Sequence, residues 1–159
     1  MPDLNLDGHV FGPGQPCFGC GPDHPIGFHL RFREEAGEIV TAFMPSEKYQ
    51  GPPGIMHGGL VSTLADELAA WAIIALLGKF GFTAQMTCKF ARPVRIGIEL
   101  EGRSKITRET SRIVQVEAKI AQAGEACFTG DFTFVLLDRA GAEKMLCRSL
   151  PEAWAKFAR

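Results

Sequence analysis

Two glycines and two carboxylates lie within one apolar stretch of this sequence, and their spacing suits chemistry on a carbonyl group. His57 is followed by Gly58 and Gly59, and Asp66 and Glu67 come nine and ten residues after the histidine. Glycines at the start of a helix let another molecule approach the unpaired backbone N–H groups closely. Such N–H groups bind an oxyanion or polarise a carbonyl.

The two carboxylates stand in otherwise apolar surroundings. The other residues from 64 to 74 are Leu, Ala, Trp and Ile, a composition typical of a buried helix. Because carboxylates are seldom buried without a partner, we expect at least one of the two to face a cleft or an interface. Glu67 points roughly 100° away from Asp66 on a helical wheel. Its expected role is a hydrogen bond or salt bridge at a subunit interface, with substrate contact and catalysis as alternatives.

The spacing of Gly59 and Asp66 has a consequence for assembly. They are seven residues apart, so they share a helix face but lie roughly 10 Å apart along the axis at about 1.5 Å per residue. One small carbonyl group cannot contact both. A second copy of the helix, antiparallel across a two-fold axis, would bring Asp66 of one subunit near Gly59 of the other. We therefore expect a homodimer, or a dimer of dimers, with sites at the subunit interface.

The overall composition fits one domain without a broad basic surface. The chain has 159 residues, 46% of them hydrophobic, and a formal net charge of −1. This length supports one hydrophobic core, so we expect a single domain over 1–159, with an irregular lead-in over 1–25 and a short C-terminal tail over 140–159. The charge argues against nucleic acid or an anionic membrane surface as a partner.

The five cysteines do not form a disulfide pattern. Their odd number and irregular spacing favour a reducing cytoplasm. The start of the chain lacks the features of a signal peptide, and the longest apolar run, 68–77, is too short to span a bilayer. Cys17, Cys20 and His24 resemble half of a zinc site. Since a second Cys-x-x-Cys half is absent, we expect no metal and no cofactor.

The apolar pattern predicts one long helix among short strands. The helix is expected from Gly58 to Leu77, ended by Gly78. Alternation predicts antiparallel strands over 28–33, 39–44, 83–94, 98–106, 114–120 and 128–136, and Pro151 suits the start of a short terminal helix. The simplest packing is an α+β fold, an antiparallel sheet of about six strands wrapped around one long central helix.

One motif connects this arrangement to a known family. Residues 53–59 read Pro-Gly-Ile-Met-His-Gly-Gly, and Asp66 follows the histidine by nine residues. Together with the order strand, helix, strands, this motif resembles the hotdog-fold acyl-CoA thioesterases of the phenylacetate-degradation (PaaI-like) type, over residues 15–138. The resemblance implies a hotdog fold and hydrolysis of an acyl-CoA thioester to free acid and coenzyme A.

The resemblance also implies roles for individual residues. In that family the glycine pair begins the central helix and its N–H groups polarise the thioester carbonyl, which implies this role for Gly58 and Gly59. Asp66 matches the catalytic acid, which attacks the carbonyl or activates a water. His57 matches a histidine that orients or polarises the thioester. Thr83 matches a Ser or Thr that positions the water or the acid.

Further residues are candidates for substrate binding. An Asn or Gln often precedes the family motif, and Gln50 corresponds to it with a spacing that differs by one residue. Lys89, Arg92 and Arg95 are candidates to hold the phosphates of coenzyme A, with a solvated polar face as the alternative. Glu67 is a further candidate substrate-binding residue.

Two other functions remain open at this stage. A hotdog hydratase or dehydratase shares the fold but usually carries a different loop signature, which is absent here. A hotdog module that binds acyl-CoA without turning it over is the non-enzymatic alternative. The acid at Asp66 argues against that module.

Overall fold

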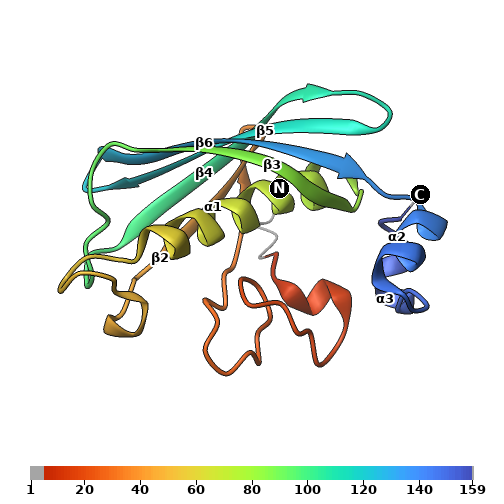
Figure 1. The fold of residues 1–159 in the computed structure, drawn as a ribbon, viewed down its shortest axis with the longest axis horizontal. Coiled ribbons are helices and arrows are strands. Elements are labelled where there is room, and N and C mark those ends of the chain that lie inside the picture. Colours follow the sequence, from red (N-terminus) through yellow and green to blue (C-terminus); the bar gives the residue numbers. More distant parts are fainter. Residues whose placement is uncertain (1–5, 159) are drawn as a thin grey trace.

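Alternating apolar and polar residues form an antiparallel sheet that curves around one long helix (Figure 1). The computed structural model describes residues 6–158. Neighbouring strands follow the order β1-β2-β4-β5-β6-β3 in a six-stranded sheet. Their bounds are β1 Arg33–Glu35, β2 Glu38–Phe43, β3 Gly81–Phe90, β4 Leu100–Glu109, β5 Ile113–Gln122 and β6 Glu125–Leu136. The predicted α+β architecture is therefore confirmed.

The central helix begins and ends where the sequence predicts. Helix α1 covers Gly58–Ala72 and continues as one π-helical turn, Ile73–Leu77. The chain then leaves the helix at Gly78, whose φ of 62° lies in the left-handed region that glycine adopts without strain. The helix from Gly58 to Leu77 is long and apolar enough to cross a membrane, with a mean hydropathy of 1.8. Its packing into the hydrophobic core accounts for this composition.

One close contact sets the distance between α1 and the sheet. A Cβ at Gly102 of β4 would lie 2.8 Å from Leu68 Cδ2, so the missing side chain lets the helix approach this closely. Nearby on β4, the Ser104 hydroxyl donates a hydrogen bond of 2.9 Å to the carbonyl oxygen of Leu68. The two contacts hold the middle of α1, and with it Asp66 and Glu67, against the sheet.

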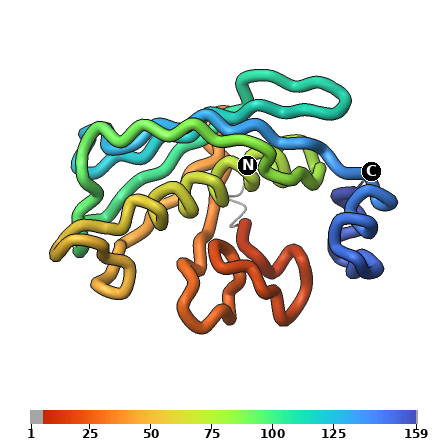
Figure 2. Tube along the Cα trace, viewed as in Figure 1, coloured from red at the N-terminus to blue at the C-terminus, as the bar shows by residue number. Residues whose placement is uncertain are grey.

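The first predicted strand is wrong over most of its length. Phe28 and Leu30 are buried, as the alternation predicts, but residues 28–31 lie outside the sheet and β1 begins only after them. The N–H of Phe28 donates to the carbonyl of Phe18 (3.0 Å), and the N–H of Leu30 donates to that of Gly19 (2.9 Å). This segment therefore pairs with the lead-in, which lies on the side of α1 away from the sheet (Figure 2).

The lead-in and the C-terminal tail contact each other. The rings of Phe11 and Trp154 stack with centroids 3.9 Å apart. The lead-in contains a 3-10 turn at Gly8–Phe11, a second such turn lies at Glu47–Tyr49, and the tail forms helices α2, Arg139–Leu146, and α3, Glu152–Ala155. Helix α3 follows Pro151, where the sequence predicts a short helix. The expectation that the start of the chain lacks signal-peptide features rests mostly on residues 1–5, and these lie outside the described residues.

Candidate active site

Asp66 of α1 and Thr83 of β3 are in direct contact. The Thr83 hydroxyl donates a hydrogen bond of 2.8 Å to Asp66 Oδ1, and both side chains are half-buried. Burial raises the pKa of the Asp66 carboxyl; the Thr83 hydroxyl lowers it in part, and the nearby charge of Glu67 adds to the rise. A carboxylate that is held in place and partly desolvated can act as a nucleophile or as a general base.

A β-bulge in β3 gives Thr83 its direction. The pairing register with β6 skips Ala84, which is the extra residue of the bulge. Directly paired residues share one face of a sheet, and Thr83 and Met86 pair with two buried phenylalanines, Phe134 and Phe132. Strict alternation would place only one of Thr83 and Met86 on this face. The bulge therefore brings a polar residue to Asp66 while the apolar residues beyond it keep the same inward direction.

The Gly-Gly end of α1 is exposed. His57 is its N-cap residue, and its Nδ1 accepts a hydrogen bond of 3.0 Å from the N–H of Gly59. Among residues 6–158, no acceptor binds the N–H of Gly58. One N–H at this helix end is therefore open to a carbonyl oxygen, and a second becomes available when the His57 ring turns away.

Gln50 lies in the loop that leads into the helix. Its side-chain oxygen accepts a hydrogen bond of 3.0 Å from the N–H of Gly54. The preceding residue, Tyr49, accepts a hydrogen bond of 2.8 Å at its carbonyl from the N–H of His57. Gln50 thus closes the turn before the Gly-Gly motif and is exposed beside it.

Two of the three candidate phosphate-binding cations gather near this loop. Arg92 and Arg95 line a surface hollow of about 330 Å³, and Arg95 forms a backbone bridge with Ile55 of the loop. Arg92 also forms an ion pair with Glu125 at the rim of the hollow. Lys89 does not line this hollow; it precedes the inward-facing Phe90 on β3 and therefore lies on the other face of the sheet.

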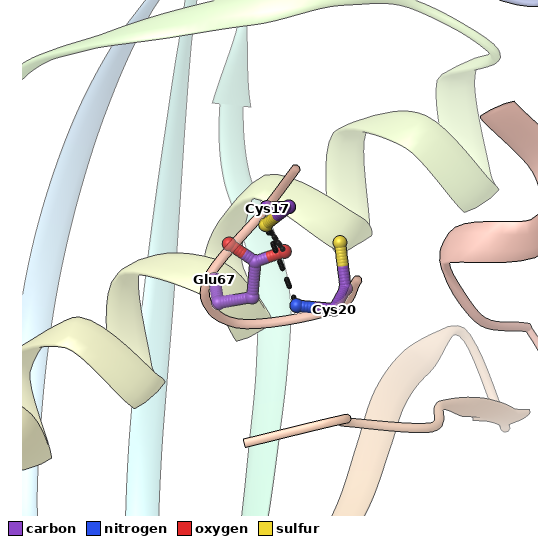
Figure 3. A group of neighbouring side chains, drawn as sticks. All are labelled: Cys17, Cys20 and Glu67. Atoms are coloured by element: carbon purple, nitrogen blue, oxygen red, sulfur yellow. Dashed lines mark hydrogen bonds between the residues drawn. The ribbon is translucent and has the colours of Figure 1, made fainter. Parts of the chain in front are cut away.

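Glu67 has partners of its own under the lead-in segment. Its Oε1 accepts hydrogen bonds from Trp71 Nε1 (3.2 Å) and from Cys17 Sγ (3.3 Å), and the thiol of Cys20 lies close by (Figure 3). Burial raises the pKa of Glu67 to about 7, and the hydrogen bond with Cys17 together with burial raises the pKa of Cys20. Glu67 therefore contacts Trp71 and Cys17, whereas Asp66 contacts Thr83.

The structure divides the predicted residues other than Lys89 among three places. Asp66 contacts Thr83; His57, Gly58 and Gly59 form the helix start, with Gln50, Arg92 and Arg95 around it; and Glu67 lies with the cysteines. Sequence reasoning missed this last grouping. The sequence offered two separate signals for it: the Cys-x-x-Cys spacing of Cys17 and Cys20, and Trp71, four residues after Glu67 on the same helix.

Comparisons with known proteins agree with this fold and motif. Residues 53–128 match the family model of the thioesterase superfamily. The acyl-coenzyme A thioesterase THEM4 of Xenopus laevis is 27% identical over 97 residues, 60% of this chain and 43% of that protein. A solved structure of a thioesterase superfamily protein is 27% identical with a TM-score of 0.70, and the match covers 75% of this chain and 59% of that one. This chain thus spans less than two thirds of either relative.

One further solved structure shares the fold of this chain. The phenylacetic acid degradation-related protein of Ralstonia eutropha JMP134 is 23% identical, and the match covers 68% of this chain and 85% of that one. Its TM-score of 0.63 shows that the two chains share a fold.

Proposed function

We propose that this chain, which has a hotdog fold and matches the thioesterase superfamily over residues 53–128, hydrolyses an acyl-CoA thioester to the free acid and coenzyme A. The observation that carries the proposal is the Asp66 carboxylate. This carboxylate is half-buried on an apolar helix and accepts a hydrogen bond from the Thr83 hydroxyl. It lies two helical turns from the exposed Gly-Gly pair at the start of the helix. These are the groups that thioester hydrolysis requires: a carboxylate and N–H donors for a carbonyl oxygen.

Two routes lead Asp66 to the same products. As a nucleophile, its oxygen attacks the carbonyl carbon, the C–S bond breaks, coenzyme A leaves as a thiolate, and water hydrolyses the acyl-aspartyl anhydride. As a general base, Asp66 takes a proton from water while the water oxygen attacks the carbonyl, and that proton then passes to the departing thiolate. In both routes the N–H groups of Gly58 and Gly59 stabilise the negative charge on the carbonyl oxygen.

The Gly59 N–H requires a rearrangement in this scheme. The Gly59 N–H donates a hydrogen bond to His57 Nδ1, so a bound carbonyl oxygen would compete with the imidazole for it. The Gly58 N–H needs no such exchange. We therefore assign the first contact with substrate to Gly58, and the second to Gly59 once the His57 ring has moved.

A second copy of the chain completes the proposed site. Gly59 and Asp66 of one helix lie roughly 10 Å apart along its axis, which is too far for one carbonyl. In residues 6–158, β3 is the edge strand beyond β6, and it exposes Phe82 (49%), Met86 (43%) and Phe90 (52%). A long edge strand with exposed apolar residues favours pairing with another chain. Two copies joined at β3 would bring their α1 helices together, with Asp66 of each facing the partner's Gly-Gly end.

The hollow beside the helix start supplies a binding surface for the polar part of coenzyme A. Arg92 and Arg95 line it, and guanidinium groups bind phosphate oxygens with two parallel hydrogen bonds. Arg95 forms a backbone bridge with Ile55, two residues before His57, so the hollow lies near the loop that leads to the N–H donors.

Thiol release from a panel of short, medium, long and aryl acyl-CoAs tests the proposal. We expect turnover of at least one class by the wild-type chain and its loss in Asp66→Asn, which keeps the shape of the side chain and removes the carboxylate. Sedimentation and thermal unfolding of Asp66→Asn serve as controls for assembly and folding. Acyl-CoA binding without turnover by any member would refute hydrolysis and favour a binding module.

A further inference from the structure

Three metal-binding side chains meet at one point of the fold, away from Asp66 and Thr83. Cys17 and Cys20 come from the lead-in segment and Glu67 from α1, and their sulfur and oxygen ligand atoms all lie within 4.8 Å of one another (Figure 3). We call these residues the thiol–carboxylate cluster. The sequence displayed only its Cys-x-x-Cys part, because the third ligand is supplied by a residue 47 positions after Cys20.

We propose that the thiol–carboxylate cluster is a zinc site that fastens the lead-in segment to the central helix. Two thiolates and a carboxylate are ligands that Zn²⁺ binds in tetrahedral sites. With Zn–S near 2.3 Å and Zn–O near 2.0–2.2 Å, tetrahedral ligands place sulfur and oxygen roughly 3.5 Å apart. Cys17 Sγ and Glu67 Oε1 lie 3.3 Å apart, so this pair needs little adjustment to hold the ion.

The loop between the two cysteines is shaped around the sulfur of Cys17. The N–H of Cys20 points at Cys17 Sγ at 3.4 Å, and the N–H of Gly21 donates to the Cys17 carbonyl at 2.9 Å. An N–H directed at sulfur stabilises the thiolate form that metals bind. The backbone thus folds the Cys-x-x-Cys loop into a turn that presents both sulfurs to α1.

Gly19 lets this turn rest directly on Glu67. A Cβ at Gly19 would lie 2.5 Å from Glu67 Cγ and 2.9 Å from Glu67 Oε2, so a larger residue would force either the loop or the Glu67 side chain to move. The close approach of loop and helix therefore depends on a residue without a side chain between the two cysteines.

The surroundings leave room for a fourth ligand. A cavity of about 120 Å³ is bordered by the three side chains and by Trp71, Ile74 and Phe134. This space exceeds what one water molecule needs, and a water can complete a tetrahedron that has three protein ligands. His24, the other candidate ligand in the sequence, accepts a hydrogen bond from the N–H of Ile26 with its Nδ1 and does not belong to the cluster.

Hydrogen bonding alone is the competing explanation of the cluster. The Cys17 thiol and the Trp71 indole N–H both reach Glu67 Oε1, which satisfies a buried carboxyl without any ion. The two explanations differ in measurable ways, since only the zinc site requires Cys20 and only the zinc site binds a metal tightly.

Metal titration of the full chain under reducing conditions tests the proposal. We expect the chain, stripped with a chelator, to take up one Zn²⁺ in competition with a chromophoric indicator. Co²⁺ in its place should give thiolate-to-metal charge transfer and the visible bands of tetrahedral cobalt. Cys17→Ser and Cys20→Ser should weaken Zn²⁺ binding by more than about 100-fold, beyond the 10–100-fold typical of residues outside the ligand set. Cys127→Ser, at a buried cysteine of β6 outside the cluster, is the matched control and should bind as wild type does.

A second measurement uses the wild-type chain alone, in case a cysteine variant fails to fold. Zn²⁺ should protect Cys17 and Cys20 from alkylation, mapped by mass spectrometry, while the exposed Cys147 reacts with and without the ion. Equal alkylation of Cys17 with and without Zn²⁺, or a Co²⁺ spectrum free of sulfur ligands, would overturn the zinc site and leave the hydrogen-bonded explanation. Neither readout involves thioester hydrolysis, so each proposal can fail without the other.

Discussion

Replacing Thr83 with valine tests the contact on which the proposed chemistry depends. Valine keeps the β-branched shape of threonine and removes the hydroxyl that donates to Asp66 Oδ1 at 2.8 Å. The strand and its packing should be preserved, because valine is at least as favourable in a strand as threonine. We expect the Thr83→Val enzyme to lose rate while its KM for acyl-CoA stays near the wild-type value, since Thr83 acts through Asp66.

The size of the loss follows from the type of bond. A hydrogen bond to a charged group contributes about 1.5–3 kcal/mol. Thr83 and Asp66 are only half-buried, so solvent replaces part of the lost bond and the lower end of this range applies. If about 1.5–2 kcal/mol appears in the barrier, at 1.36 kcal/mol per tenfold, kcat falls roughly 10- to 30-fold.

Steady-state thiol release on the best substrate of the panel measures this effect. Thr83→Ser keeps the hydroxyl and should retain most of the wild-type kcat, whereas Asp66→Asn sets the lowest rate on the scale. A folded Thr83→Val enzyme with the wild-type kcat would refute the positioning role, and so would a Thr83→Ser enzyme as slow as the valine variant.

Three further predictions follow from other contacts. Met86→Lys places a charge on the exposed edge of β3 and should shift the protein from dimer to monomer in sedimentation velocity, with loss of activity; an unchanged dimer would place the interface elsewhere. Gly102→Ala sets a methyl group 2.8 Å from Leu68 Cδ2 and should destabilise the fold by about 1–3 kcal/mol in urea unfolding; unaltered stability would mean that the helix–sheet spacing is relaxed. Arg95→Ala should raise KM for acyl-CoA and leave kcat unchanged. Substitution of the exposed Lys119 by Ala should change neither constant, and equal effects of the two substitutions would contradict a phosphate site in the hollow.

Features that depend on neighbouring residues were predictable from the sequence. The central helix was predictable at both ends because glycines mark them: the helix begins at Gly58, and Gly78 follows its last residue. The later strands appear near the predicted positions because their alternation is regular and one face of each is buried. The resemblance implies that Thr83 positions either the water or the acid, and in the structure its hydroxyl donates a hydrogen bond to Asp66.

Features that depend on distant partners were not predictable in this way. Phe28 and Leu30 alternate like strand residues, but their N–H groups find acceptors at Phe18 and Gly19 before the sheet begins. Periodicity reports which side chains are buried and cannot identify the backbone partner. Glu67 accepts a hydrogen bond from the thiol of Cys17, which is fifty residues away in the sequence. No local sequence pattern encodes a contact over that distance.

The single extra residue in β3 decides how the faces of this strand must be counted. Without Ala84 the pairing would be regular, with Thr83 opposite Phe134 and Met86 opposite Phe132, so deleting it would leave both side chains on the same face and remove only the bulge. Strict alternation with Ala84 counted would instead put Met86 and Phe90 on the face opposite Thr83. The residue that contacts the carboxylate and the residues that form the apolar edge therefore share one face because Ala84 is left out of the pairing. An assignment of faces that ignores the bulge would place half of the strand on the wrong side.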